Sequence, residues 1–216
     1  MINPSFPDAD SDYYVQEKRF LYDLIPDGPN VVMDLGCGSG RVGKGLLDSN
    51  KAAKVVGVEI FPPAAKEAVK SYETVHVGDL EEFQLNYKEY FDIVVCGDIL
   101  EHLKEPWKIV LQIHHWLKAN GRLICCVPNI RYWRVLKDLA LFGKWEYAME
   151  GILDQTHLRF FTRRSFRKML TDASFAIELE RMRIAVGPKQ ETFNRVTHGL
   201  FEEFLAIQML FSARKS

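Results

Sequence analysis

Short runs rich in β-branched residues alternate with segments of helical periodicity along most of this chain. Such alternation is typical of β-α-β units, in which largely parallel strands form one sheet and helices cover its faces. The predicted strands are Val31 to Leu35, Lys54 to Glu59, Thr74 to Val77, Phe91 to Cys96, Arg122 to Val127, Phe175 to Ala185 and Phe204 to Ala213. The predicted helices are Tyr13 to Leu24, Val42 to Ser49, Pro63 to Tyr72, Pro106 to Leu117 and Arg164 to Ala173. The sequence therefore predicts an α/β domain with a seven-stranded sheet.

The alternation is interrupted after Pro128, where residues 129–161 are rich in aromatic and basic side chains. Loops longer than about 15 residues in a compact domain are usually functional. No linker sets this segment apart, and 216 residues with 47% hydrophobic content suit one hydrophobic core. We therefore predict a single domain over residues 1–216, with residues 129–161 inserted as a lid on the acceptor side.

Charge and targeting signals exclude several classes of partner. The chain has 28 Lys and Arg against 29 Asp and Glu, a net charge of −1, so its overall charge does not attract nucleic acid. The four cysteines lack zinc-site spacing, which favours reduced thiols. The N-terminus has no secretory signal, and no apolar run approaches the roughly 18 residues that span a bilayer. We expect a cytoplasmic protein, and the sequence leaves its oligomeric state open.

A glycine-rich turn follows the first predicted strand directly, between Leu35 and Arg41. Glycines let a ligand approach the backbone, and the N–H groups that open the next helix point toward that ligand. A tight structural turn would have the same composition. Gly38, Gly40 and Gly43 also fit the G-x-G-x-x-G pattern of dinucleotide-binding proteins, so a nicotinamide-dependent oxidoreductase is an alternative. That frame fits less well because it starts two residues late relative to the strand.

Carboxylates stand at the ends of the next two predicted strands. Glu59 ends the second strand, where a carboxylate can accept hydrogen bonds from both ribose hydroxyls of an adenosine. Asp79 follows the third strand, where it could accept from an adenine amino group while the N–H of Leu80 faces a ring nitrogen. A helix cap or a solvated strand end is the alternative for either residue. The three strand ends recur at intervals that suit successive β-α units.

In order along the chain, the segments VMDLGCGSG, VVGVEI, VGDLEEF and FDIVVCGDILEHLKEP resemble the motifs of class I S-adenosylmethionine-dependent methyltransferases. The resemblance extends from about Tyr13 to Lys215. It implies a Rossmann-like fold with helices on both faces of the sheet, strand order 3-2-1-4-5-7-6 and strand 7 antiparallel. It also implies S-adenosylmethionine as the cofactor.

The same resemblance implies a set of cofactor-binding residues, namely Asp34, Gly36, Cys37, Gly38, Gly40, Glu59, Ile60, Asp79, Leu80 and Asp98. Within this set, Asp34, Gly36 and Gly38 would border the methionine part of the cofactor. Glu59 would hold the ribose, and Asp79 with Leu80 would hold the adenine. Asp98 would lie beside the sulfonium, where a carboxylate or a backbone carbonyl favours the positive charge.

Acceptor chemistry is expected just beyond the fourth strand, where Asp98 is followed by Glu101 and His102. Methyl transfer to a hydroxyl needs alignment of the acceptor and removal of its proton. In some quinone-modifying relatives a similar acidic-x-x-Glu-His run binds a divalent metal, but no further ligand can be named here from sequence, so we expect no metal. The alternative is that Glu101 and His102 cap the next helix and line the cofactor pocket.

A second acceptor-side segment follows the insertion. The run GILDQTHLRFFT, from Gly151 to Thr162, resembles the GxLDxTHLRFFT signature of a bacterial methyltransferase branch associated with surface-polysaccharide or natural-product assembly. The resemblance implies that Asp154 and His157 face the acceptor pocket and that Thr162 caps the next helix. We predict His157, His102 and Asp154 as catalytic residues. For His157, a structural hydrogen bond is the alternative.

The insertion and the two motif regions together give the functional prediction. From Ile130 to Trp145, apolar residues recur at helical spacing and suggest a lid, with membrane contact or ordinary core packing as alternatives. The predicted activity is methyl transfer to a polar small molecule or sugar, at oxygen, with nitrogen as the second choice. A nicotinamide-dependent oxidoreductase and a cofactor-binding regulatory module without turnover are two further interpretations of the same motifs.

Overall fold

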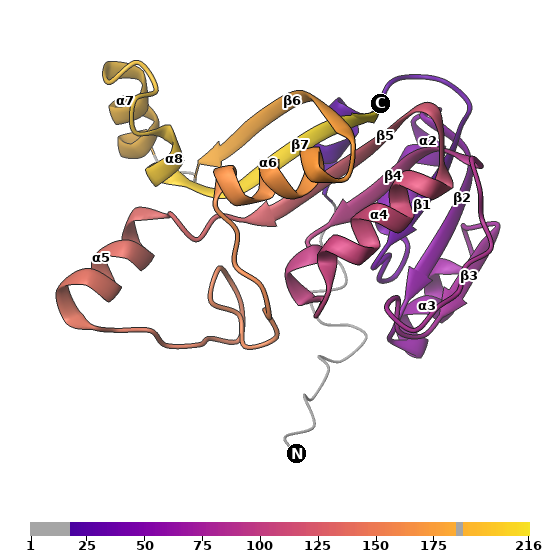
Figure 1. The fold of residues 1–216 in the computed structure, drawn as a ribbon, viewed down its shortest axis with the longest axis horizontal. Helices are drawn as coiled ribbons and strands as arrows, with labels where there is room; N and C mark the ends of the chain where they lie inside the picture. The colour runs from indigo at the N-terminus through magenta and orange to yellow at the C-terminus, as the bar shows by residue number, and fades with distance from the viewer. Residues whose placement is uncertain (1–17, 185–187) are drawn as a thin grey trace.

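A seven-stranded mixed sheet forms the centre of the computed structural model, which describes residues 18–184 and 188–216 (Figure 1). The strands are β1 (Asn30–Leu35), β2 (Ala52–Glu59), β3 (Thr74–Val77), β4 (Phe91–Gly97), β5 (Leu117–Pro128), β6 (Phe175–Ile184) and β7 (Ala206–Lys215). Their order is β3-β2-β1-β4-β5-β7-β6, and β7 runs antiparallel to both β5 and β6. The predicted strand order and the direction of strand 7 are confirmed.

The helical elements are η1 (Arg19–Leu24), α2 (Arg41–Asp48), α3 (Pro62–Ala68), η2 (Leu100–His102), α4 (Pro106–Trp116), α5 (Trp133–Phe142), α6 (Arg163–Asp172), α7 (Pro188–Val196) and α8 (Glu202–Leu205). The predicted N-terminal helix is replaced by the 3-10 helix η1 over its described part, and residues 13–17 lie outside the described residues. The last strand begins at Ala206 because Phe204 belongs to α8.

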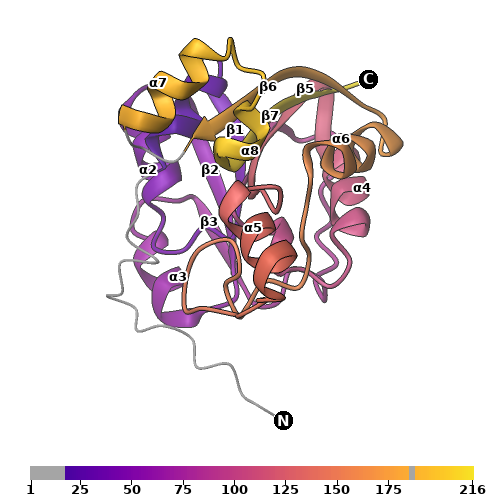
Figure 2. The ribbon, with the colours of Figure 1, turned by 90° about the vertical axis from the view of Figure 1, so that its left-hand side faces the viewer.

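Hydrophobic side chains pack on both faces of the sheet. On one face, α4 and α6 contribute Ile109, Ile113 and Phe166 to the larger cluster of buried residues. On the other face, η1 and α2 contribute Leu21 and Leu46 to a second cluster. Figure 2 shows the sheet between the two groups of helices. This arrangement is the three-layered packing that alternating strands and helices predict.

Parallel pairing brings the ends of the central strands to one edge of the sheet. Leu35 at the end of β1 is in register with Val58 of β2 and with Cys96 of β4. In turn, Glu59 of β2 pairs with Val77 at the end of β3. The loops that follow β1, β2, β3 and β4 therefore meet at this edge, which is where ligands bind in open α/β sheets.

Residues 129–161 leave the sheet after β5 and contain α5, which projects away from the sheet in Figure 1. Every residue of α5 keeps part of its surface exposed, and Leu141 and Phe142 are each 69% exposed. Core packing therefore does not explain the apolar spacing of this helix. Within residues 18–184 and 188–216, no helix is both long and apolar enough to cross a membrane.

Candidate functional site

The turn after β1 is held in a conformation that favours glycine. Gly36, Gly38 and Gly40 have φ angles of +68°, +54° and +82°, in the left-handed region that side chains with a Cβ avoid. The N–H groups of Gly36 and Cys37 donate to the carbonyl of Val58, at 2.9 and 3.0 Å, which ties the turn to β2. Because α2 begins at Arg41, directly after Gly40, the turn presents the N-terminus of a helix at the sheet edge.

Glu59 connects this turn to the end of β2. Its carboxylate is buried and accepts hydrogen bonds from the N–H of Gly38 at 2.7 Å and from the N–H of Phe61 at 2.8 Å. Burial raises the pKa of Glu59, and these backbone donors oppose that rise. Each carboxylate oxygen has two lone pairs, so the group can accept further hydrogen bonds from a diol such as a ribose.

Asp34 lies beneath the turn and is bonded to a residue that the sequence analysis did not single out. The hydroxyl of Tyr72 donates to Asp34 Oδ2 at 2.6 Å and accepts from the N–H of Gly43 at 2.9 Å. Burial raises the pKa of Asp34 to about 6, although the Tyr72 hydrogen bond lowers it. Tyr72 and Asp34 are 38 positions apart, and no local sequence pattern links them.

The packing of Tyr72 also explains two details of the sequence. A Cβ on Gly43 would come within 2.4 Å of the Tyr72 hydroxyl, so this glycine is required by the tyrosine ring. The match of Gly43 to the dinucleotide pattern therefore has a packing cause. Helix α3 stops at Ala68, before the predicted end at Tyr72, and the chain turns there so that Tyr72 enters the core.

The end of β3 places the predicted adenine residues beside Glu59. The N–H of Gly78 donates to the backbone carbonyl of Glu59 at 2.8 Å. Asp79 Oδ1 accepts from the N–H of Glu81 at 2.9 Å, which closes a short turn, and Leu80 is buried. Ile60 is 47% exposed and follows Glu59 at the same edge. The predicted adenosine residues are thus brought together, and their cofactor contacts stay a prediction.

Asp98, at the end of β4, is engaged by two side chains. Lys18 Nζ lies 2.7 Å from Asp98 Oδ2 and donates to the carbonyl of Gly97 at 2.6 Å, while Gln208 donates to Asp98 Oδ1 at 2.8 Å. Burial lowers the pKa of Lys18, but Asp98, together with Cys126 and Glu101, outweighs that effect, so the pKa of the lysine is raised. Sequence reasoning placed Lys18 only in an amphipathic segment and gave no sign of this ion pair.

Beyond β4, Glu101 approaches the end of the insertion. The backbone carbonyl of Glu101 accepts from the N–H groups of Leu158 and Arg159 at 2.8 and 2.9 Å. These two hydrogen bonds hold the last residues of the insertion next to η2. One carboxylate oxygen of Glu101 and one nitrogen each of His102 and His157 lie within 4.8 Å of one another. The two imidazole centroids are 4.7 Å apart. We call these three residues the acceptor-side cluster.

The carboxylate of Glu101 is in an unusual environment. Glu101 is 1% exposed, and neither carboxylate oxygen has a hydrogen-bond partner among the described residues. Burial, and then the charge of Asp98, raise the pKa of Glu101 well above its usual range. Leaving a buried carboxylate without a partner is costly, so a native structure that retains one calls for an explanation.

Hydrogen bonds fix the tautomers of both imidazoles. His157 Nδ1 lies 2.9 Å from the carbonyl oxygen of Ile152, which can only accept, so Nδ1 carries the proton. Thr156 Oγ1 donates to Asp154 Oδ1 at 2.6 Å and therefore accepts from His102 Nδ1 at 3.0 Å. When either ring is neutral, its lone pair is therefore on Nε2. Burial, and then His157, lower the pKa of His102 to about 4, which keeps it neutral at pH 7.

Asp154 holds the loop that carries His157. Its Oδ1 accepts from both the N–H and the hydroxyl of Thr156, at 2.7 and 2.6 Å. It thereby holds Thr156, whose hydroxyl contacts His102 Nδ1. The structure brings all three predicted catalytic residues into one region, while their roles in the reaction stay predictions.

Two capping predictions have different outcomes. Thr162 is confirmed as the N-cap of α6, where its side chain accepts from the N–H of Ser165 at 3.1 Å. The capping alternative for Glu101 and His102 is wrong, because α4 begins after Glu105. Instead, the carboxylate of Glu81, in the loop between β3 and β4, binds the backbone directly before α4. It accepts from the N–H groups of Lys104 and Glu105 at 3.0 and 2.7 Å.

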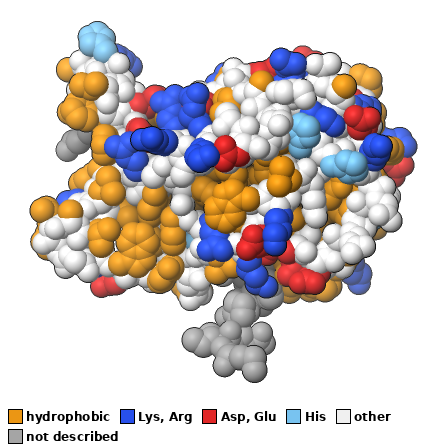
Figure 3. Space-filling model, viewed as in Figure 1, with side chains coloured by type: hydrophobic (Ala, Val, Ile, Leu, Met, Phe, Trp, Pro, Cys, Tyr) orange, Lys and Arg blue, Asp and Glu red, His pale blue; other side chains and the backbone are white. Residues whose placement is uncertain are grey.

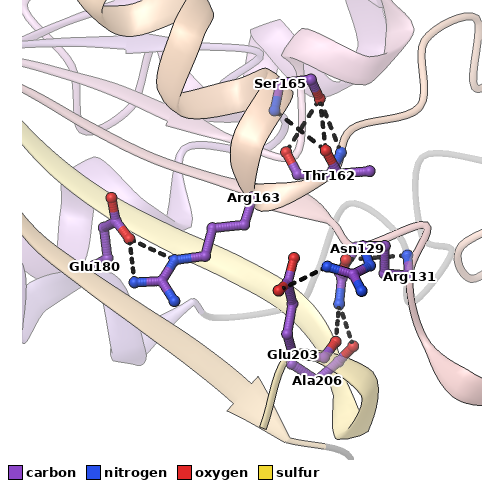
Figure 4. Close-up of polar contacts among 8 residues, drawn as sticks. All are labelled: Asn129, Arg131, Thr162, Arg163, Ser165, Glu180, Glu203 and Ala206. Atoms are coloured by element: carbon purple, nitrogen blue, oxygen red, sulfur yellow. Dashed lines mark hydrogen bonds and ion pairs between the residues drawn. The ribbon is translucent and has the colours of Figure 1, made fainter. Parts of the chain in front are cut away.

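The two ends of the insertion are anchored next to each other (Figure 4). Asn129 donates to the carbonyls of Glu203 and Ala206, at 2.7 and 2.9 Å, and Arg131 forms an ion pair with Glu203 at 2.9 Å. Asn129 also forms a β-bridge with Phe161, directly before the Thr162 cap. The insertion is therefore a loop closed at its neck, with the acceptor-side cluster near its returning end.

A chain of ring contacts extends from the cluster into the insertion. His157 contacts Phe160 with 6.5 Å between ring centroids, and Phe160 contacts Trp145 and Tyr147 at 5.3 and 6.4 Å. Tyr147 is 54% exposed, and other apolar residues of the insertion are also exposed, each to a different extent. Figure 3 shows hydrophobic side chains gathered on the surface where α5 and the following loop lie.

Comparisons with known proteins show the family to which this chain belongs. A family described as a methyltransferase domain matches residues 12–180. A malonyl-[acyl-carrier protein] O-methyltransferase of Halalkalibacterium halodurans is 29% identical over 105 residues, which cover 45% of this chain and 39% of that protein. A ubiquinone biosynthesis O-methyltransferase of Haemophilus ducreyi is 28% identical over 138 residues, covering 58% of this chain and 56% of that protein. The chain thus spans about two fifths of the length of the first relative and somewhat over half of the length of the second.

Solved structures show the same fold. An S-adenosylmethionine-dependent methyltransferase from Mesorhizobium loti has a TM-score of 0.65 and 18% identity, with 92% of this chain and 97% of that chain covered. A Haloferax volcanii methyltransferase, in a complex with the Trm112 activator, gives a TM-score of 0.67 and 15% identity over 94% of this chain and 90% of the matched chain. At these identities the likeness establishes the fold.

Proposed function

Because this chain belongs to the methyltransferase-domain family, which matches residues 12–180, we propose that it transfers a methyl group from S-adenosylmethionine, the cofactor of that family, to a hydroxyl oxygen of a polar small molecule or sugar. The observation that carries the choice of oxygen is the acceptor-side cluster. Glu101, His102 and His157 offer lone pairs beside the end of β4, where a hydroxyl proton would have to be received. Two curated relatives, the malonyl-carrier and ubiquinone-pathway enzymes, are also O-methyltransferases by name.

The residues at the sheet edge fit the cofactor. The left-handed glycine turn and the start of α2 present backbone N–H groups, which suit the carboxylate of a methionine moiety. Glu59 is fixed by Gly38 and Phe61, so it is already oriented to accept from a ribose. Asp79 and Leu80 follow at the neighbouring strand end for the adenine. When bound, the cofactor supplies the methyl group on a positively charged sulfur.

Acceptor activation is assigned to the cluster. In the transfer, the acceptor oxygen forms a bond to the methyl carbon as the carbon–sulfur bond breaks, and the electron pair of that bond returns to sulfur. The hydroxyl proton must leave in the same process. His157 is the first candidate to receive it, because its Nδ1–H is fixed by Ile152 and its lone pair is on Nε2. Asp154 and Thr156 keep His102 oriented beside it.

The insertion supports an acceptor with an apolar portion or one presented at a membrane. The ring contacts from His157 to Phe160 and Trp145 lead from the cluster to an exposed apolar surface. On α5 itself, Leu141 and Phe142 face solvent. A surface of this kind usually marks an interaction site. Such an acceptor is compatible with surface-polysaccharide or natural-product assembly.

The experiment is a transfer assay with S-adenosylmethionine labelled on its methyl group. Purified protein is incubated with a panel of nucleotide sugars, small phenols and primary amines, and the labelled products are identified. We expect label on a hydroxyl-bearing acceptor. His157→Ala should lower turnover about 100-fold or more, whereas the matched surface variant His115→Ala should not. Label found only on amines, or unchanged turnover in His157→Ala, would contradict the oxygen assignment.

A further inference from the structure

Lys18 is a basic side chain that lies inside the predicted cofactor edge, and the proposed function gives it no role. Its Nζ lies 2.7 Å from Asp98 Oδ2 and donates to the carbonyl of Gly97 at 2.6 Å. The lysine side chain is 21% exposed, so it is largely shielded from water. An ammonium group thus occupies the end of β4, which is where the positive sulfur of the cofactor is expected.

The charge of Lys18 acts on groups at two strand ends. Burial is the largest influence on the pKa of Asp34 in β1 and on that of Glu101 after β4, and it raises both values. The positive charge of Lys18 acts in the opposite direction on each of them. β1 and β4 are parallel neighbours, with Leu35 in register with Cys96. The ammonium group is therefore within electrostatic reach of both strand ends, where open α/β sheets bind their ligands.

The cofactor brings a second positive charge to the same carboxylate. S-adenosylmethionine has a positively charged sulfur, and the sulfur of the product S-adenosylhomocysteine is neutral, whereas the amino-acid part carries the same charges in both. Two cations beside one carboxylate repel each other. We propose that Lys18 determines the charge specificity of the cofactor site: its ammonium pairs with Asp98 when the neighbouring sulfur is absent or neutral, and S-adenosylmethionine displaces it. This inference rests on the proposed function, because it requires that the edge binds this cofactor.

Of the two partners in the ion pair, Asp98 is held in place and Lys18 can move. Asp98 has a φ of +52°, and its N–H donates to the carbonyl of Cys126 at 3.2 Å. Gln208 donates to the other carboxylate oxygen, Oδ1, at 2.8 Å. Lys18 carries its charge at the end of a flexible four-carbon stem. A competing cation therefore displaces the lysine and leaves the carboxylate in position.

The surroundings of the stem indicate which part of Lys18 moves. A Cβ on Gly97 would come within 3.2 Å of Lys18 Cδ and 3.3 Å of Leu21 Cδ1, so the glycine leaves room for the stem beside η1. Leu21 is fully buried, and its N–H donates to the backbone carbonyl of Lys18 at 2.9 Å. The backbone at Lys18 is thus tied to the core, and rotation of the side chain is sufficient to release Asp98.

The position of Lys18 follows the charge on sulfur through the reaction. Methyl transfer breaks the carbon–sulfur bond and leaves both electrons on sulfur, which becomes neutral, while the proton of the acceptor hydroxyl goes to His157 as proposed above. Asp98 then has no positive sulfur beside it, and Lys18 returns. The restored ion pair stabilises the complex with S-adenosylhomocysteine relative to the complex with S-adenosylmethionine. Lys18 therefore favours the transfer step in the forward direction.

The test is a chemical footprint of Lys18 in the wild-type protein. Samples without ligand, or saturated with S-adenosylmethionine, S-adenosylhomocysteine or the neutral thioether 5′-methylthioadenosine, are treated briefly with an amine-acetylating reagent. Acetylation of each lysine is then measured by mass spectrometry of proteolytic peptides. We expect acetylation of Lys18 to become about 5-fold faster or more with S-adenosylmethionine, because its ammonium leaves the ion pair, and to stay unchanged with the two neutral-sulfur ligands.

Lys51 provides a matched control within the same samples. Its side chain is 20% exposed, its Nζ lies 2.7 Å from Asp27 Oδ1, and it donates to the carbonyl of Ile25 at 2.8 Å. These contacts are of the same kind as those of Lys18, but Lys51 directly precedes β2 and so lies at the opposite edge of the sheet. Its acetylation should not respond to any of the three ligands.

The outcomes separate this inference from the proposed function. If S-adenosylmethionine raises the Tm and the acetylation of Lys18 stays as in the free protein, the inference is wrong. Equal protection of Lys18 by S-adenosylmethionine and S-adenosylhomocysteine also overturns it, because the lysine would then bind the carboxylate that the two ligands share. A protein whose Tm responds to neither ligand would refute the proposed function and, with it, this inference.

Discussion

Lys18 and Asp98 form an ion pair at the end of β4, with 2.7 Å between Nζ and Oδ2. The two side chains are 21% and 20% exposed, so the pair is partly shielded from solvent. A positively charged ammonium group thus neutralises the carboxylate that is expected to lie beside the cofactor sulfonium.

This pairing predicts a charge-specific change in ligand binding. In Lys18→Met, Asp98 loses its partner and should attract the positive S-adenosylmethionine more than the neutral-sulfur product S-adenosylhomocysteine. We expect the ratio of the Kd of S-adenosylmethionine to that of S-adenosylhomocysteine to fall several-fold, whatever happens to either affinity alone. Isothermal titration with both ligands measures the ratio. An unchanged ratio would show that Asp98 lies away from the sulfur.

Asp34 predicts a pH dependence of stability. Burial raises its pKa from 3.8 to about 6 in the folded protein, so folding favours the protonated form. The associated stability is complete below about pH 4 and is lost as the pH rises through about 6, a loss of roughly 3 kcal/mol. Asp34→Asn keeps an acceptor for Tyr72 but does not titrate. The variant should therefore match wild type near pH 4 and exceed it near pH 7.

Urea unfolding of both proteins without cofactor, at several pH values, measures this difference. Groups that titrate equally in the two proteins cancel in the comparison. Parallel pH profiles for wild type and Asp34→Asn would show that Asp34 titrates normally in the folded protein.

Glu59 predicts the response to the cofactor product. Saturating S-adenosylhomocysteine at about 100 times its Kd should stabilise wild type by roughly 2.7 kcal/mol. Glu59→Ala should lose most of the Tm shift for two reasons. The ribose loses its acceptor, and the N–H of Gly38 in the glycine turn loses the carboxylate to which it donates. The exposed variant Glu67→Ala on α3 provides the control. Stabilisation by a nicotinamide dinucleotide instead would reverse the choice of cofactor.

The exposed side chains of α5 predict a separation of stability from binding. Replacing Leu141 and Phe142 by Ser should change the free energy of unfolding by no more than about 0.5 kcal/mol per site, because both are 69% exposed. By contrast, Phe166→Ala in the core should cost about 3 to 5 kcal/mol. If the insertion contacts a membrane, the double variant should also lose sedimentation with anionic lipid vesicles. Equal sedimentation of both proteins would remove the membrane from the proposal.

The sequence by itself determined that the chain forms a largely parallel α/β sheet, and it predicted the edge at which the cofactor would bind, because both follow from local patterns. Alternating strand and helix periodicity predicts parallel strands, and parallel strands bring their ends to one edge. The residues at those ends, from Gly36 to Glu59 and Asp79, are therefore identifiable as neighbours from their positions along the chain. The resemblance of residues 151–162 to the GxLDxTHLRFFT signature likewise identified Thr162 correctly as a helix cap.

Only the tertiary structure decided which distant side chains meet. Tyr72 reaches Asp34 because α3 ends early and the chain turns into the core. Lys18 reaches Asp98, and His157 reaches Glu101 and His102, across large separations in sequence. Such contacts depend on how a loop closes and on which backbone groups it bonds, as Leu158 and Arg159 do with Glu101. Hydrophobic periodicity carries no record of these contacts, so the grouping of Glu101 with His102 and His157 became visible only in three dimensions.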